Sequence, residues 1–166
     1  MSKTLIGKKI NNHIYDLCTI ERNALSGGEP IYFDNSEDSL EIIRHSCAHL
    51  MAQAIKAIYP EAQFFVGPVV EEGFYYDFKV AHKIGEEDLP AIESKMREIA
   101  QKAYPIEKYT TTRLLAQEKF ANDELKLAVM SKIEGDSFSF YTQGDFEDLC
   151  RGPHLPNTKF LEHFKL

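Results

Sequence analysis

The sequence lacks any long apolar run. No stretch approaches the roughly 18 consecutive apolar residues that a membrane-spanning helix needs, and the N-terminal stretch MSKTLIGKKINN has no apolar core of the signal-peptide type. Cysteine is also scarce, because the three cysteines, Cys18, Cys47 and Cys150, are too few and too scattered for a disulfide framework. These absences argue against membrane proteins and disulfide-rich secreted proteins, and they predict a cytoplasmic protein.

Positive charge is in deficit as well. The chain has 19 lysines and arginines against 26 aspartates and glutamates, which gives a net charge of −7. This balance argues against a domain that binds nucleic acid by its backbone alone, because phosphate binding needs clustered basic residues. It leaves open a domain that acts on one end of a nucleic acid held elsewhere. The C-terminal part has a local group of basic residues and histidines that is either a small electrostatic footprint or a solvated surface: Arg151, His154, Lys159, His163 and Lys165.

What is present is the composition of an ordinary globular protein. The 166 residues are 43% hydrophobic and 27% charged, enough for one domain with a core and at most a short appendage. Residues 1–30 are expected to form a short leader, with a hairpin that turns at Asn11 and Asn12 and a linker at residues 26–28. The main domain is expected to span residues 31–166.

A long helix is predicted at residues 36–58. Asn35 or Ser36 can cap its first turn, and the Pro60 that follows ends it. Apolar residues recur at every third or fourth position and form the expected buried stripe: Leu40, Ile43, Cys47, Leu50, Ala54 and Ile58.

The rest of the chain predicts alternating helices and strands. Residues 63–80 alternate apolar and polar residues and predict β-structure with a turn at Glu72-Gly73. A second amphipathic helix is predicted at residues 88–104, with Pro90 in its first turn. This order predicts an α+β fold with an antiparallel sheet packed with long helices. The remaining predicted elements are strands at 106–111, 137–141 and 146–149, short helices at 113–120 and 124–133, and a loop at Gly152-Pro153.

Two histidines share one face of the first predicted helix. His45 and His49 are four residues apart, so both rings lie on one side. At about 100° per residue they point away from the buried stripe and lie beside Ala48 and Ala52. We expect this face to form the floor of a cleft, whereas the intervening Cys47 belongs to the core.

The same spacing recurs at Cys150 and His154. Together with His45 and His49 these residues offer three imidazoles and one thiol, and three interpretations are open. The first is a metal site, because zinc accepts these ligands and a helical histidine pair is a common half-site. The second is a metal-free hydrolytic site, in which histidines position a water molecule and transfer protons near neutral pH. The third is that the side chains are separate surface groups.

Further polar and aromatic residues have two interpretations each. Asp148 is two residues before Cys150 and shares its strand face, so its carboxylate either binds a substrate ammonium or is an exposed strand end. Lys126 lies in a mostly apolar helical run, where a lysine usually extends to solvent, and catalysis is the alternative. Three aromatic residues either stack on a nucleotide base or belong to the core: Tyr75, Tyr76 and Phe78.

Three long motifs resemble one family. The strings RHSCAHLMAQAIKAIYP at residues 44–60, GPVVEEGFYYDF at 67–78 and DLCRGPHLPNTKF at 148–160 are similar to the editing domain of bacterial threonyl-tRNA synthetases. The resemblance covers residues 30–166. It implies the threonyl/alanyl-tRNA synthetase editing-domain fold and hydrolysis of seryl-tRNA(Thr), with the tRNA acceptor end and the synthetase catalytic core as partners. Such proofreading is needed because a pocket that holds threonine gains only about 1–3 kcal/mol over serine, which lacks one methyl group.

The resemblance also implies roles for single residues. His45 and Lys126 match the residues expected to order or activate a water molecule that attacks the ester carbonyl. Cys150 is implied as a pocket wall rather than a nucleophile, and Asp148 as the group that holds the ammonium or hydroxyl of the amino acid. The residues expected to bind substrate are His49, Asp148, Cys150 and His154.

The resemblance leaves two alternatives. Threonyl-type domains are expected to edit without a cofactor, whereas alanyl-type relatives carry zinc on the same frame, so a zinc-dependent trans-editing deacylase with zinc at His45, His49, Cys150 and His154 is one alternative. A non-catalytic tRNA-binding module is the other. Residues 1–30 are at most a remnant of the family's ubiquitin-like module, and nothing resembles a synthetase catalytic core. We therefore expect an excised or freestanding editing domain that does not aminoacylate.

Overall fold

The N-terminal strands form a small antiparallel sheet. In the computed structural model, which describes residues 3–18 and 27–166, strand β1 (Leu5–Ile10) pairs with both β2 (His13–Asp16) and β3 (Glu29–Tyr32). The hairpin predicted from the asparagine pair is confirmed, because Asn11 and Asn12 both have positive φ, as a two-residue turn of the primed type requires. The predicted linker begins at residue 26, which lies outside the described residues.

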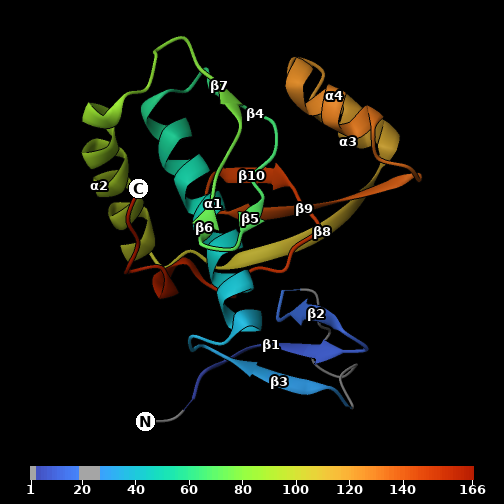
Figure 1. Ribbon diagram of the computed structural model, residues 1–166. Helices are drawn as coiled ribbons and strands as arrows, with labels where there is room; N and C mark the ends of the chain where they lie inside the picture. The colour runs from blue at the N-terminus through green and yellow to red at the C-terminus, as the bar shows by residue number, and fades with distance from the viewer. Residues whose placement is uncertain (1–2, 19–26) are drawn as a thin grey trace.

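Helix α1 (Glu37–Ile58) is the centre of the molecule, and its predicted extent is confirmed to within one residue. Figure 1 shows α2 (Leu89–Gln101) on one side of it, the second three-stranded sheet on the other, and the N-terminal sheet near its first turn. The single buried stripe expected from the sequence is wrong in part, because a helix enclosed on two sides buries two faces. Leu40, Ile43 and Ile58 are only half-buried. The residues buried in addition to the predicted stripe include Ile42, Ser46, Ala48, His49, Ala52, Gln53 and Ile55.

The second three-stranded sheet is antiparallel, and its strands lie in the order β10 (Phe146–Leu149), β9 (Ser137–Gln143) and β8 (Ile106–Thr112). Residues of β9 alternate between two clusters: Phe138 and Phe140 pack towards the short helices, whereas Tyr141 belongs to the cluster around α1. The sheet is therefore a layer between α1 and the helix pair. Its elements and the helix pair closely match the predicted ranges: β8 (Ile106–Thr112), α3 (Arg113–Lys119), α4 (Glu124–Ser131), β9 (Ser137–Gln143) and β10 (Phe146–Leu149).

The β-structure predicted at residues 63–80 is divided into two short ladders. Strand β4 (Gln63–Phe64) pairs with β7 (Phe78–Lys79), and β5 (Val69–Val70) pairs with β6 (Gly73–Phe74). The turn lies at residues 71–72, one position earlier than predicted, because Gly73 already pairs with Val70. The described residues thus form several small antiparallel sheets and four α-helices, which confirms an α+β class but not the single sheet we expected.

Hydrogen bonds connect helix α2 with Lys165 and Leu166. A 3-10 turn, η1 (Glu86–Asp88), precedes α2, and another, η2 (Thr158–Phe160), follows β10. Glu93 of α2 accepts hydrogen bonds from the Lys165 side chain and the Leu166 backbone, and these bonds lower the pKa of Glu93 to about 2. None of the helices in residues 3–18 and 27–166 is long and apolar enough to span a membrane.

Candidate functional site

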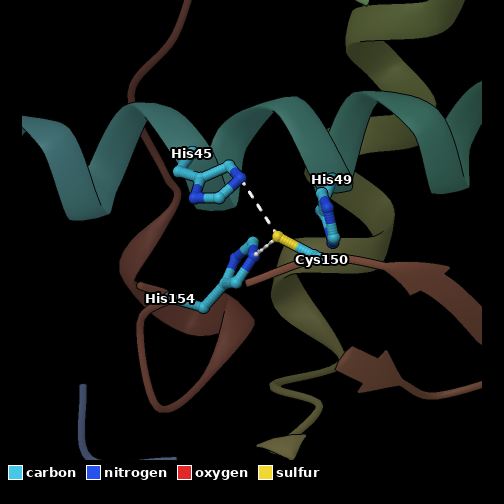
Figure 2. A group of neighbouring side chains, drawn as sticks. All are labelled: His45, His49, Cys150 and His154. Carbon is cyan, nitrogen blue, oxygen red and sulfur yellow. Dashed lines mark hydrogen bonds between the residues drawn. The ribbon is translucent and has the colours of Figure 1, made fainter. Parts of the chain in front are cut away.

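The two spaced pairs meet in one cluster. His45 and His49 extend from α1, Cys150 follows β10 directly, and His154 lies on the loop beyond it (Figure 2). The Sγ atom of Cys150 is 3.2 Å from Nε2 of His45 and 3.2 Å from Nε2 of His154. One nitrogen or sulfur atom from each of the four residues lies within 4.8 Å of the others. These side chains are therefore not separate surface groups.

Burial keeps the cluster uncharged near neutral pH. His49 is 2% exposed and His154 is fully buried, and desolvation holds the pKa of both well below the usual 6.5. Burial also lowers the pKa of His45, and it raises the pKa of the Cys150 thiol to about 12. At pH 7 the cluster thus consists of three neutral imidazoles and a protonated thiol.

The hydrogen bonds of two histidines fix their tautomers. Nδ1 of His45 lies 3.1 Å from the Pro153 carbonyl oxygen, which can only accept, so Nδ1 carries the proton. The Ser46 hydroxyl donates to the Ile42 carbonyl at 2.8 Å and therefore accepts from Nδ1 of His154, 3.3 Å away. In both rings the Nε2 lone pair consequently faces Cys150.

One thiol cannot satisfy both lone pairs, because it has a single proton. The cluster therefore has more acceptors than donors. In addition, Nδ1 of His49 is buried and has no hydrogen-bond partner among the described residues. An arrangement with surplus acceptors suits a ligand that brings N–H or O–H donors, or a cation.

The donor set also fits a soft divalent metal ion. Zinc accepts imidazole nitrogen and cysteine sulfur, and zinc–ligand lengths of about 2.0–2.3 Å place neighbouring ligand atoms about 3.5 Å apart. The two 3.2 Å contacts of Cys150 are close to this spacing, whereas the 4.8 Å limit shows that the widest pair would have to move together. Cys150 would have to lose its proton to bind the ion.

The cluster opens into a cavity of about 310 Å³. His45, His49 and Cys150 line it, whereas His154 contacts Cys150 but does not line the cavity. Its other walls come from the segment before β5, from α4 and from β9. The wall residues are mostly apolar, with a few polar groups: Phe65, Val66, Gly67, Tyr76, Val129, Ile133, Glu134, Ser137, Phe138, Ser139, Leu149 and Arg151.

A buried ion pair lies next to this cavity. Lys126 of α4 and Asp148 of β10 are each 2% exposed and form a salt bridge, and Asp148 also accepts a hydrogen bond from the Tyr76 hydroxyl. The interpretations of Lys126 as a solvent-exposed lysine and of Asp148 as an exposed strand end are therefore wrong. Burial of each charge is balanced by the opposite charge, which a sequence pattern does not reveal.

Asp148 and Cys150 share a strand face but line different cavities. Phe146 and Cys150 pack against the cluster around α1, whereas Leu149 packs on the side of α3 and α4. The side chains of β10 thus alternate between the two faces of the sheet as far as Cys150, which places Asp148 on the same face as Cys150. Asp148 and Lys126, however, line a separate cavity of about 230 Å³. Lys126 and Asp148 do not line the cavity next to the histidines.

Tyr76 connects the two parts of the site. Its ring lines the larger cavity, and its hydroxyl binds Asp148. Of the three aromatic residues with two interpretations, Tyr75 is 48% exposed, whereas Tyr76 is 8% exposed. The sequence placed Tyr76 on the apolar face of its strand but gave no sign of the bond to Asp148. Sequence reasoning missed Ser46 as well, because a serine within a helix has no distinguishing pattern.

Comparisons with known proteins agree with the sequence resemblance. Residues 138–166 match the family described as the threonyl and alanyl tRNA synthetase second additional domain. A threonine–tRNA ligase of Helicobacter hepaticus is 70% identical over 162 residues, which cover 98% of this chain and 27% of that protein. Threonine–tRNA ligases of Helicobacter pylori and Helicobacter acinonychis are 69% and 68% identical over 143 residues, 86% of this chain and 23% of each relative. The chain thus spans about a quarter of the length of these relatives.

Proposed function

Since the chain is homologous over nearly its whole length to one region of Helicobacter threonine–tRNA ligases, we propose that it is a threonyl-type editing domain. It hydrolyses the ester of seryl-tRNA(Thr) and spares threonyl-tRNA(Thr), and it lacks aminoacylation activity. Its fold is the threonyl/alanyl-tRNA synthetase editing type. It acts in the cytoplasm on the acceptor end of tRNA, together with the catalytic core of the parent synthetase.

One observation carries this proposal: four residues from two distant segments form an uncharged, acceptor-rich cluster, and three of them, His45, His49 and Cys150, line a small cavity. Neutral imidazoles transfer protons near pH 7, as ester hydrolysis needs. The cavity of about 310 Å³ is at the small end of the range for ligand sites. A small, mostly apolar pocket is suited to reject an additional methyl group by its size.

His45 is the proposed proton acceptor. Its Nδ1 is held by the Pro153 carbonyl, so Nε2 presents a lone pair to the cavity side of the cluster. A water molecule attacks the ester carbonyl carbon, and His45 takes up a proton from that water. The bond between the carbonyl carbon and the ribose oxygen then breaks, and the proton passes to the ribose oxygen. The products are serine and a tRNA with its terminal hydroxyl restored.

Cys150 acts as a pocket wall in this proposal. With a pKa of about 12 the thiol remains protonated near neutral pH, whereas a nucleophilic cysteine needs its thiolate. The thiol proton instead forms a hydrogen bond with Nε2 of either His45 or His154. His49 also lines the cavity, and His154 contacts Cys150 through Nε2 without lining it.

Lys126 and Asp148 act as a pair. The substrate ammonium is the cation that replaces Lys126 beside Asp148, and the released Lys126 then stabilises the negative charge that develops on the carbonyl oxygen. This exchange requires the Tyr76 side chain to move, because Tyr76 lies on the larger cavity and binds the same carboxylate.

The test is deacylation of seryl-tRNA(Thr) and threonyl-tRNA(Thr) in parallel. We expect the chain to release serine and to leave the threonyl ester intact. His45→Ala and Lys126→Ala should each reduce the rate, whereas His13→Ala and Lys95→Ala, which lie away from the cavity, should not. Native rates in both of the first two variants contradict the assignment, and binding of tRNA without ester loss would indicate a non-catalytic module.

A zinc-dependent deacylase of the alanyl type is the second candidate. The observation in its favour is the convergence of donor atoms from His45, His49, Cys150 and His154. When bound there, zinc would supply a Lewis acid. We favour hydrolysis without a cofactor, because the three motif strings resemble the threonyl type, which is expected to edit without zinc.

A further inference from the structure

A carboxylate from the N-terminal sheet reaches the loop that carries His154. Asp16, the last residue of β2, is 1% exposed. Its Oδ2 atom accepts a hydrogen bond from the backbone N–H of His154 at 2.8 Å and another from the hydroxyl of Tyr141 at 2.6 Å. These contacts join residues 138 and 125 positions apart in the sequence.

The loop packs closely on this carboxylate and phenol. A Cβ atom at Gly152 would lie 2.1 Å from the Tyr141 hydroxyl and 3.0 Å from Oδ2 of Asp16, so only glycine allows the observed approach. The ring of Tyr141 also contacts the ring of His154, with centroids 4.3 Å apart. Asp16 therefore fixes the loop at its backbone and, through Tyr141, at Gly152 and the His154 ring.

The same loop sets the orientation of His45. The carbonyl of Pro153, the residue before the backbone N–H that Asp16 binds, lies 3.1 Å from Nδ1 of His45. A shift of the loop at His154 would therefore move two of the imidazoles that face Cys150. The effect of Asp16 thus extends to atoms that it does not touch.

We propose that Asp16 is a positioning residue of the editing site, which holds the loop at residues 150–154 so that His45, Cys150 and His154 keep their mutual geometry. The N-terminal strands then form part of the site rather than a leader beside it. The catalytic consequence rests on the proposed editing function, whereas the geometric claim does not.

The test compares two substitutions of Asp16. Asp16→Ala removes the acceptor, and we expect kcat for seryl-tRNA(Thr) to fall at least about tenfold, with KM little changed, because small misplacements of reacting groups cost rate. A single oxygen accepts both bonds, so Asp16→Asn can place its amide oxygen there, and we expect kcat within about threefold of the native value. Glu98→Ala is the control, because it also removes a carboxylate but breaks exposed ion pairs at α2, with Lys95 and Lys102.

A second readout separates positioning from simple stabilisation. Cys150 is alkylated with iodoacetamide well below the unfolding temperature, and the reaction is followed by peptide mass spectrometry. We expect the rate of alkylation to change severalfold in Asp16→Ala but not in Asp16→Asn or in the control variant. Should Asp16→Ala fail to fold, Tyr141→Phe removes one of the two bonds and should give the same changes at smaller size. Native kcat and native alkylation in the folded variant overturn the proposal. If the native chain does not hydrolyse seryl-tRNA(Thr), the editing proposal fails, while the alkylation result still decides the role of Asp16.

Discussion

The thiol of Cys150 lies 3.2 Å from Nε2 of His45, although the two residues are 105 positions apart in the chain. The Pro153 carbonyl keeps the proton of His45 on Nδ1, so Nε2 of His45 can only accept a hydrogen bond. The Cys150 thiol can donate its single proton either to this atom or to Nε2 of His154. This relationship makes Cys150 a partner of the imidazoles.

Substitution of Cys150 tests whether it is a wall or a nucleophile. Cys150→Ala removes the only proton shared between two imidazoles, so we expect seryl-tRNA(Thr) deacylation to fall about tenfold or more. Cys150→Ser retains a one-proton donor and should keep more activity than alanine. Rapid quenching and mass spectrometry of the native protein should detect no seryl adduct on Cys150, and a trapped thioester would show that it is a nucleophile.

Removal of one partner from the Lys126–Asp148 pair should destabilise the fold. Both side chains are 2% exposed, and a buried charge without its partner costs about 3–5 kcal/mol. We expect Lys126→Met to lower the free energy of unfolding by this order in urea titrations. The double variant Lys126→Met/Asp148→Asn should lose less than the two single losses added together. Additive losses would mean that the two charges do not interact.

Two nearby glycines, of which only Gly67 lines the larger cavity, offer a matched comparison. A Cβ atom at Gly67 would lie 2.4 Å from the ring of Tyr76, whereas a Cβ atom at Gly73 would meet no atom of the described residues within 4 Å. Gly67→Ala should therefore displace Tyr76 from Asp148, lower stability by about 1–3 kcal/mol and reduce deacylation. Gly73→Ala should change stability by less than about 0.5 kcal/mol. Equal effects in thermal unfolding and in the ester assay would contradict a special role for the Tyr76 position.

The buried histidines should make stability depend on pH. Their pKa values are lowered from 6.5 in the folded protein, so the unfolded chain binds more protons as the pH falls. The free energy of unfolding should therefore be fully present above pH 6.5 and decrease below it, by about 1.4 kcal/mol per pH unit for each imidazole that stays neutral. The pKa of Glu93 is about 2 in the folded protein against its usual 4.5, so protonation of Glu93 decreases the free energy of unfolding only below pH 4.5.

Urea titrations between pH 7.5 and pH 5 measure this slope. His49→Asn should reduce it, because one buried imidazole is gone, whereas His163→Gln should leave it unchanged, because His163 is exposed. A flat profile in the native protein would show that the imidazoles are accessible to protons in the folded state.

Metal removal distinguishes the two candidate mechanisms. We expect purified protein dialysed against a chelator to keep its seryl-tRNA(Thr) deacylation rate, because the proposed steps use only His45, Lys126 and water. Metal content by mass spectrometry and the ester assay are measured on the same samples. One mole of zinc per mole of protein, lost together with activity and restored with it, would favour the zinc-dependent mechanism.

Local patterns in the sequence predicted most of the secondary structure. The periodicity of apolar residues located α1, α2 and the β8–β10 sheet within a few positions, and the asparagine pair located the first turn. The same patterns were insufficient at α1, because they cannot show that a helix is enclosed on two sides. They also joined residues 63–80 into one region of β-structure, where tertiary packing divides it into two ladders.

The sequence by itself determined that His45 and His49 share a helix face and that Cys150 and His154 repeat their spacing, because four-residue spacing is a local property of the chain. The division into residues 1–30 and 31–166 remains a prediction. Only the tertiary structure decided that the two pairs meet, that Lys126 is buried against Asp148, and that Asp16 holds the His154 loop. These contacts join residues 22 to 138 positions apart, and their existence depends on how layers pack and on which buried charges find partners, which no local pattern specifies.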